Sequence, residues 1–214
     1  PAPEKRETPG ERWPRRPPSR LVVAGAPVDK GELVQVPVFP YGDKEIAHLK
    51  ERDPILGEAI DRIGRIEREV IPELFPGLIH TILAQQISSQ AVKTVWQRFR
   101  EVFPEMTPPV LAAADMETIQ RCGTSFRKAG YIKGVAEAVL AGKLDLRRLP
   151  LMPDEEVVKH LCALKGLGLW SAEMFLIFSL LRPDVVSWGD LAIRKGMMAL
   201  YNLPELDRDT FEKY

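Results

Sequence analysis

The stretch LCALKGLGLWSAEMFLIFSLL, residues 161–181, decides the fold of this chain. It places two glycines, Gly166 and Gly168, on either side of Leu167, between two segments of helix-forming residues. Glycine permits positive φ angles and a close approach of neighbouring backbone. We therefore expect a very tight turn that joins two helices, with Leu167 packed between them.

Further positions around the turn fit this arrangement. Leu161 and Leu164 precede it at helical spacing, and Ala172 follows four residues after Gly168, where a small side chain lets two helices pack closely. The first N–H groups of the helix that follows Gly168 are unpaired, and the positive end of its dipole points outward. Such a helix start binds an anion without a basic side chain, and a DNA phosphate is the anion that we expect. The pattern is that of a helix-hairpin-helix; a glycine-rich connector in an all-α core is the alternative.

The composition sets limits on the class of protein. With 214 residues and 45% hydrophobic content, the chain can bury a core in one or two domains. No apolar run approaches the roughly 18 residues of a membrane span, so we expect a soluble, cytoplasmic protein, nucleoid-associated if bacterial. Lys plus Arg equals Asp plus Glu at 30 each, so net charge alone does not indicate a polyanionic partner. Cys122 and Cys162 lack C-x-x-C spacing, and we expect two buried free thiols.

The chain divides into three parts by residue pattern. Residues 1–20 are rich in proline and arginine and predict a flexible arm, to which we assign no chemistry. Residues 21–42 hold short β-branched runs cut by proline and glycine, which predict an extended or β-like segment. Apolar residues recur at helical spacing over residues 43–214. Within that part we expect helices from residue 43 to 63, a helix pair over residues 75–103, and helices over residues 108–113, 116–122, 128–141 and 154–163.

The segment RPDVVSWGDLAIRKGM places Asp190 at the start of another helix, 24 residues after Gly166. Together with the hairpin, it resembles the helix-hairpin-helix (HhH-GPD) DNA glycosylase superfamily, most closely the 3-methyladenine DNA glycosylase II branch. PYGDKEIAHLKERDP, ILAQQIS, KGLGLWSAEMFLIF and RPDVVSWGDLAIRKG carry the resemblance, which covers residues 40–214. It implies an all-α fold of two helical lobes with the site between them. It also implies base flipping and hydrolysis of the N-glycosidic bond of alkylated purines (3-methyladenine, 7-methylguanine) in duplex DNA, the first step of base excision repair.

The resemblance makes Asp190 the catalytic residue. Glycosidic cleavage builds positive charge on the sugar, and a carboxylate fixed beside C1′ stabilises that charge and orients the attacking water. An aspartate before Leu191 is also a favoured helix N-cap, and the two roles are compatible. Bifunctional members of the superfamily use a lysine four residues after the first hairpin glycine. This chain has Trp170 there, so we expect no lyase activity.

Trp170 suits a pocket in which an extruded base stacks on an aromatic face, a contact strongest for cationic alkylpurines. Trp188 and Met174 are further candidates for the pocket wall, with core packing as the alternative for all three. No second carboxylate or histidine is tied to the site by spacing, which favours bases that leave readily. His80 and Glu173 remain candidates for a partner acid.

The ILAQQIS segment supplies the expected wedge. In the superfamily this loop fills the gap that a flipped base leaves, which here points to Gln86 or Ile87, while Gln85 and Ser88 contact the gap or cap the next helix. An ordinary interhelical turn is the alternative. The remaining expected DNA contacts come from the hairpin and two lysines: Gly166, Leu167, Gly168, Lys165 and Lys195. Arg127, Lys128 and Arg194 are further candidates for phosphate contact, with a solvated surface charge as the alternative.

The resemblance also bears on ligands and partners. We expect no required cofactor, but a Na⁺ or K⁺ ion held by the backbone carbonyls of Cys162, Leu164 and Leu167. The expected partner is double-stranded DNA with damaged bases, bound by a monomer. Two other functions stay open: a glycosylase for deaminated bases (hypoxanthine, uracil) on the same scaffold, and a noncatalytic DNA-binding module. Asp190 argues against the second.

Overall fold

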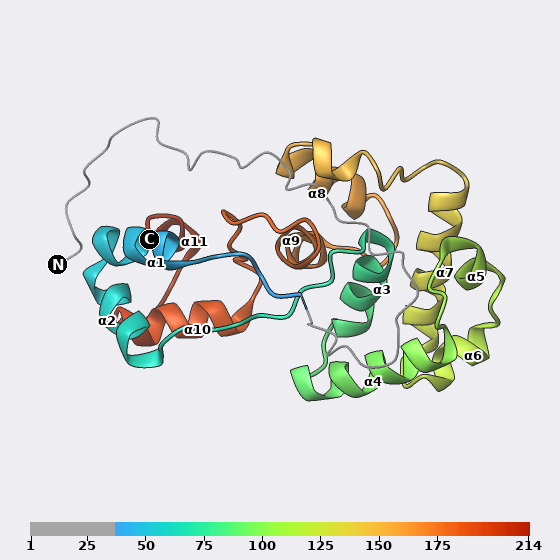
Figure 1. Ribbon diagram of the computed structural model, residues 1–214, viewed down its shortest axis with the longest axis horizontal. Coiled ribbons are helices and arrows are strands. Elements are labelled where there is room, and N and C mark those ends of the chain that lie inside the picture. The colour runs from blue at the N-terminus through green and yellow to red at the C-terminus, as the bar shows by residue number, and fades with distance from the viewer. Residues whose placement is uncertain (1–36) are drawn as a thin grey trace, which may run out of the picture. The chain divides into compact units, whose positions relative to one another are not determined.

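The computed structural model describes residues 37–214, which form eleven α-helices and one short 3-10 helix (Figure 1). The helices are α1 Asp43–Arg52, α2 Pro54–Ile63, α3 Leu74–Ala84, α4 Ser89–Val102, α5 Pro108–Ala113, α6 Met116–Arg121, α7 Phe126–Leu140, η1 Leu149–Leu151, α8 Asp154–Cys162, α9 Leu169–Phe178, α10 Leu191–Leu200 and α11 Arg208–Phe211. The all-α prediction is confirmed for this part of the chain. Its one β pairing is an isolated antiparallel bridge between Val38 and Glu69. The arm predicted over residues 1–20, and most of the segment predicted over residues 21–42, lie outside the described residues.

The helix boundaries follow from local capping chemistry. Asp53 precedes Pro54, the first residue of α2, and its side chain accepts the N–H of Leu56 at 3.0 Å. Ser88 and Ser125 cap α4 and α7 in the same way. Such caps satisfy N–H groups that have no partner within the helix, and proline in the first turn loses no hydrogen bond.

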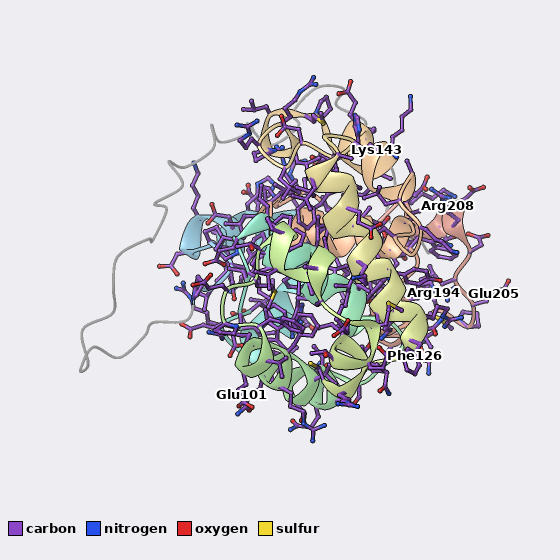
Figure 2. The ribbon with its side chains drawn as sticks, turned by 90° about the vertical axis from the view of Figure 1, so that its right-hand side faces the viewer. Glu101, Phe126, Lys143, Arg194, Glu205 and Arg208 are labelled. Carbon is purple, nitrogen blue, oxygen red and sulfur yellow. The ribbon has the colours of Figure 1, made fainter. Side chains whose placement is uncertain are left out.

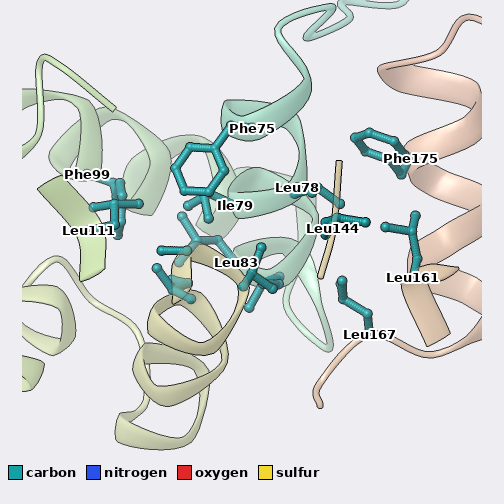
Figure 3. Close-up of a cluster of buried hydrophobic side chains, with 14 of the residues drawn as sticks. Phe75, Leu78, Ile79, Leu83, Phe99, Leu111, Leu144, Leu161, Leu167 and Phe175 are labelled. Carbon is teal, nitrogen blue, oxygen red and sulfur yellow. The ribbon is translucent and has the colours of Figure 1, made fainter. Parts of the chain in front are cut away.

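The core is built around α3, which packs against α4, α7 and α9 (Figure 1). Because three neighbours surround it, α3 is apolar on nearly every side: Phe75, Leu78, Ile79, Ile82 and Leu83 are all buried. Leu161 of α8, Leu167 of the hairpin and Phe175 of α9 belong to the same cluster (Figure 3). Each such side chain contributes about 1.5–3 kcal/mol by leaving water.

A second set of contacts joins α1, α2 and α10. α2 packs against both α1 and α10, and the hydroxyl of Tyr201, at the end of α10, donates a short hydrogen bond to the carboxylate of Asp53. Burial and the neighbouring Asp53 raise the pKa of Tyr201. None of the residues of α10 is buried, so this helix stays accessible along its length, including its N-terminus at Asp190.

Lowering the pH is expected to destabilise the protein through His80. This side chain meets Trp96 edge-on, with ring centroids 5.0 Å apart, and burial lowers its pKa from 6.5 to about 4. The unfolded chain therefore binds a proton between pH 6.5 and 4 that the folded chain does not, so stability is lost as the pH falls through this window. We expect a loss of up to about 3 kcal/mol at pH 4.

Urea unfolding at pH 7 and pH 4.5 measures this effect. His80→Phe keeps an aromatic ring beside Trp96 and should remove most of the histidine contribution, whereas His160→Phe, on the exposed side of α8, should keep it. Identical pH dependence in the native chain and in His80→Phe would rule the explanation out.

The two cysteines differ in exposure. Cys122 is buried as expected, but Cys162 is exposed, so the prediction of two buried thiols is wrong for Cys162. The buried face of α8 carries Val157 and Leu161, four residues apart, and the next residue along a helix points about 100° away from that face. Burial raises the pKa of the Cys122 thiol.

The helices and polar side chains of residues 37–214 bear on two further properties, membrane spanning and metal binding. No helix there has both the length and the apolar character needed to span a bilayer. The same residues hold no cluster of three or more His, Cys, Asp and Glu side chains placed to bind a metal ion.

Candidate active site

The hairpin between α8 and α9 has the tight geometry that its sequence predicts. Leu167 is buried, and its N–H donates to the Leu164 carbonyl at 3.1 Å. Gly166 has a φ of +93°, and a Cβ atom there would lie 2.1 Å from Cγ of Tyr131, so only glycine fits. Gly168 is different: its backbone is extended and a Cβ atom would meet open space. The two glycines therefore have different structural roles, and only Gly166 needs a positive φ.

Gly168 is the N-cap of α9, and no side chain caps this helix. The first N–H groups of α9 therefore have no side-chain acceptor at an exposed helix start, as the sequence predicts for an anion site. Leu169, the first residue of the helix, is 47% exposed although it is apolar. The exposed backbone and an exposed apolar side chain together suit contact with a sugar-phosphate chain.

Asp190 is the N-cap of α10, which confirms the local prediction from its sequence. Its Oδ1 accepts the N–H groups of Ala192 at 2.8 Å and Ile193 at 3.3 Å. Its Oδ2 accepts the indole N–H of Trp170 at 3.3 Å. Both carboxylate oxygens are thus held, one by the start of α10 and one by α9, so the orientation of the group is fixed.

Of the three predicted pocket residues, the structure brings Trp170 to Asp190. Trp188 instead packs against Phe211 with ring centroids 5.2 Å apart, and the guanidinium of Arg194 lies over its ring at 4.8 Å. Met174 is half-buried on α9. The contact between Trp170 and Asp190 is new: the sequence predicted Trp170 as a stacking surface, not as a hydrogen-bond donor to the carboxylate. The stacking roles of all three stay predictions.

The loop after α3 presents Gln86 and Ile87 outward. Gln86 is exposed with a φ of +57°, a left-handed conformation that a residue with a side chain adopts at a cost of about 1–2 kcal/mol, and Ile87 is 39% exposed. Ser88 caps α4 by accepting the N–H of Ala91 at 3.3 Å. Gln85 turns inward, where its amide nitrogen donates to the Gly166 carbonyl at 2.7 Å and to the buried Ser171 hydroxyl at 3.0 Å.

Lys128, a candidate for phosphate contact on sequence grounds, is instead bonded to the backbone of this loop. Its ammonium donates to the carbonyls of Leu83 at 2.8 Å and Gln85 at 2.7 Å, which stabilises the C-terminal end of α3. Burial, with a smaller effect of Arg127, lowers the pKa of Lys128. No sequence pattern indicated this contact, because it joins residues more than forty positions apart. The other two lysines predicted to contact phosphates, Lys165 and Lys195, are exposed, and Lys165 borders a cavity of about 340 Å³ beside Phe126 and Tyr131.

Comparisons with known proteins identify the family of this chain. The model of the HhH-GPD superfamily of base excision DNA repair proteins matches residues 79–213, and the chain belongs to this family. DNA-3-methyladenine glycosylase of Saccharomyces cerevisiae is 32% identical over 180 residues, which cover 76% of this chain and 61% of that protein. DNA-3-methyladenine glycosylase 1 of Schizosaccharomyces pombe is 39% identical over 101 residues, which cover 47% of this chain and 44% of that protein.

Solved structures show the same fold. The 3-methyladenine DNA glycosylase of Schizosaccharomyces pombe, determined in complex with abasic DNA, superposes with a TM-score of 0.71 at 31% identity, over 78% of this chain and 85% of that one. A DNA-3-methyladenine glycosidase of Bacillus halodurans gives 0.66 at 32% identity, over 80% of each chain. Matches to three curated relatives cover between 34% and 61% of their length.

Proposed function

We propose that this protein is a monofunctional DNA glycosylase that flips alkylated purines out of duplex DNA and hydrolyses their N-glycosidic bond, the first step of base excision repair. The observation that carries the proposal is the Asp190 carboxylate, fixed at an accessible helix start and bonded to Trp170. Membership of the HhH-GPD superfamily and the names of the 3-methyladenine glycosylases above support it.

The hairpin and the loop after α3 contact different parts of the DNA. The N–H groups at the start of α9 receive a phosphate of the damaged strand, and the exposed side chains of Lys165, in the hairpin, and Lys195, on α10, are cations for further phosphates. Gln86 or Ile87, the outward side chains of the loop, fill the gap that the flipped base leaves. Gln85 belongs to the structure beneath that loop, because its amide is already bonded to the hairpin.

Asp190 performs the chemistry as a fixed negative charge. As the bond between base and sugar lengthens, positive charge grows on C1′ and the ring oxygen, and a carboxylate already oriented by three N–H groups stabilises it without reorganising. The same carboxylate orients water for attack at C1′. A cationic alkylpurine leaves as a neutral base, so the reaction needs no proton donor for the leaving group.

Trp170 accounts for the restriction to hydrolysis. Its indole offers no amine, so a Schiff base with C1′, and the strand cleavage that follows one, are not expected from this position. Its ring remains available to stack against a positively charged base.

The backbone carbonyls of Cys162, Leu164 and Leu167 remain our proposal for a monovalent cation at the hairpin. The Leu164 carbonyl already accepts one hydrogen bond, from Leu167, and a carbonyl oxygen has a second lone pair to offer. Such an ion would stiffen the turn that presents Gly168 to the phosphate.

Chromatography of bases released from three duplexes tests the proposal. Methylated DNA should yield free 3-methyladenine and 7-methylguanine, while the strand stays intact until alkali cleaves the abasic site. Faster release from duplexes containing hypoxanthine or uracil would identify a glycosylase for deaminated bases instead. Duplex binding without release of any base would leave a noncatalytic module, and strand cleavage without alkali would contradict the assignment of Trp170.

A further inference from the structure

Residues 187–190 are the last part of the connection between α9, which ends at Phe178, and α10, whose N-cap is Asp190. The N–H of Asp190 donates to the carbonyl of Ser187 at 3.2 Å, which closes a turn over Trp188 and Gly189. The position of Ser187 therefore decides where α10 begins and where its capping carboxylate stands.

Ser187 is itself anchored to α9. Its side chain is fully buried, and its hydroxyl donates a short hydrogen bond to Oε2 of Glu173. A hydroxyl bonded to a carboxylate is a charge-assisted contact, stronger than one between neutral groups. Neither residue is hydrogen-bonded to the Asp190 carboxylate, whose partners are Trp170, Ala192 and Ile193.

Glu173 and Trp170 lie three positions apart on α9, so their side chains lie on the same face of the helix. Trp170 donates a hydrogen bond to the side chain of Asp190, at the end of the 187–190 loop. Glu173 accepts a hydrogen bond from Ser187, at the beginning of the same loop. We propose that Glu173 and Ser187 form a buried brace that sets the position of the Asp190 carboxylate, which makes both of them positioning residues for base release. The catalytic part of this inference rests on the function proposed above.

The brace differs from the partner-acid role considered for Glu173 on sequence grounds. An acid must give up a proton, so Glu173→Gln would abolish its contribution. A brace needs only an oxygen that accepts the hydrogen bond from Ser187, which the amide of glutamine also supplies. A comparison of Glu173→Gln with Glu173→Ala therefore distinguishes the positioning role from the acid role.

The test measures three quantities on full-length protein carrying Glu173→Gln, Glu173→Ala or Ser187→Ala: hydrogen exchange at the amides of Asp190 and Ala192, affinity for abasic duplex, and the single-turnover rate of 3-methyladenine release. Glu101→Ala is the control, since Glu101 is an exposed carboxylate on α4 that accepts one hydrogen bond, from Gln97 (Figure 2). All measurements are made where circular dichroism shows every variant folded.

We expect Glu173→Ala and Ser187→Ala to speed exchange at both amides by at least about tenfold and to slow base release about 10–100-fold, the scale of a misplaced catalytic group. Affinity for abasic duplex should stay within about twofold, because binding through the hairpin does not involve the brace. Glu173→Gln and Glu101→Ala should resemble the native chain.

Three outcomes would overturn the inference. Unchanged exchange in Glu173→Ala would show that the loop does not depend on the brace. Equal loss of base release in the Gln and Ala variants would assign Glu173 to proton transfer. If the native chain releases no base, the proposed function fails and so does the catalytic role of the brace, while the exchange data still decide whether it holds the loop.

Discussion

Replacing Asp190 with Asn is expected to slow base release by at least about a hundredfold while leaving the protein nearly as stable as before. The charge that stabilises the sugar cation is lost, and removing a preorganised stabilising group has effects of this size. The amide oxygen of asparagine can still accept the bonds from Ala192 and Ile193, and asparagine caps helices as well as aspartate. Single-turnover release of 3-methyladenine and urea unfolding measure the two effects separately.

Asp190→Ala provides the matched comparison. It removes the cap as well as the charge, so the unfolding free energy should fall by about 1 kcal/mol in addition to the loss of activity. Release of base by Asp190→Asn at the native rate would refute the role assigned to the carboxylate. A large loss of stability in Asp190→Asn would mean that the charge, rather than the cap, holds the start of α10.

Replacing Gly166 with Ala is expected to destabilise the fold by about 2–4 kcal/mol. The new Cβ atom would overlap the ring of Tyr131, and the backbone would have to keep a positive φ that alanine disfavours. Urea unfolding measures the loss. Because the overlap is with a side chain, adding Tyr131→Ala to Gly166→Ala should relieve part of the steric overlap. The positive φ remains in the double variant, so the backbone strain is not relieved.

Gly168→Ala is the internal control for that experiment. Its backbone is extended and a Cβ atom there meets open space, so the unfolding free energy should change by less than about 1 kcal/mol. The affinity of Gly168→Ala for duplex DNA should fall instead, because the added methyl group would stand where we propose that a phosphate approaches the start of α9. Similar destabilisation by Gly166→Ala and Gly168→Ala would contradict the different structural roles assigned to the two glycines.

The features predicted from sequence were those that short segments specify. The hairpin depends on six positions within residues 161–172, and the caps of α4 and α10 depend on Ser88 and Asp190 with the residues just after them. Helical periodicity likewise predicted most helices to within a few residues. Local chemistry determines these features, so the sequence displays them directly.

What the sequence did not reveal was the set of contacts between distant segments. Gln85 bonds to Gly166, 81 positions away, and Lys128 bonds to a carbonyl 43 positions away. Polar residues of this kind look the same in sequence whether they face solvent, a phosphate or a buried carbonyl. Only the packing of α3 against α7 and α9 decides among these roles, and that packing depends on the whole core.

If the uncapped start of α9 binds a phosphate as proposed, it also determines how DNA binding responds to ionic strength. Backbone N–H groups carry only partial charges, and Lys128, bonded to two carbonyls, is not free to pair with a phosphate. A protein that binds duplex DNA mainly through backbone amides displaces few of the cations condensed on the DNA. Each displaced cation adds about one unit to the slope of log affinity against log salt concentration. We therefore expect the protein's affinity for duplex DNA to decline gently as salt rises, so that a chain with equal numbers of acidic and basic residues can still bind a polyanion.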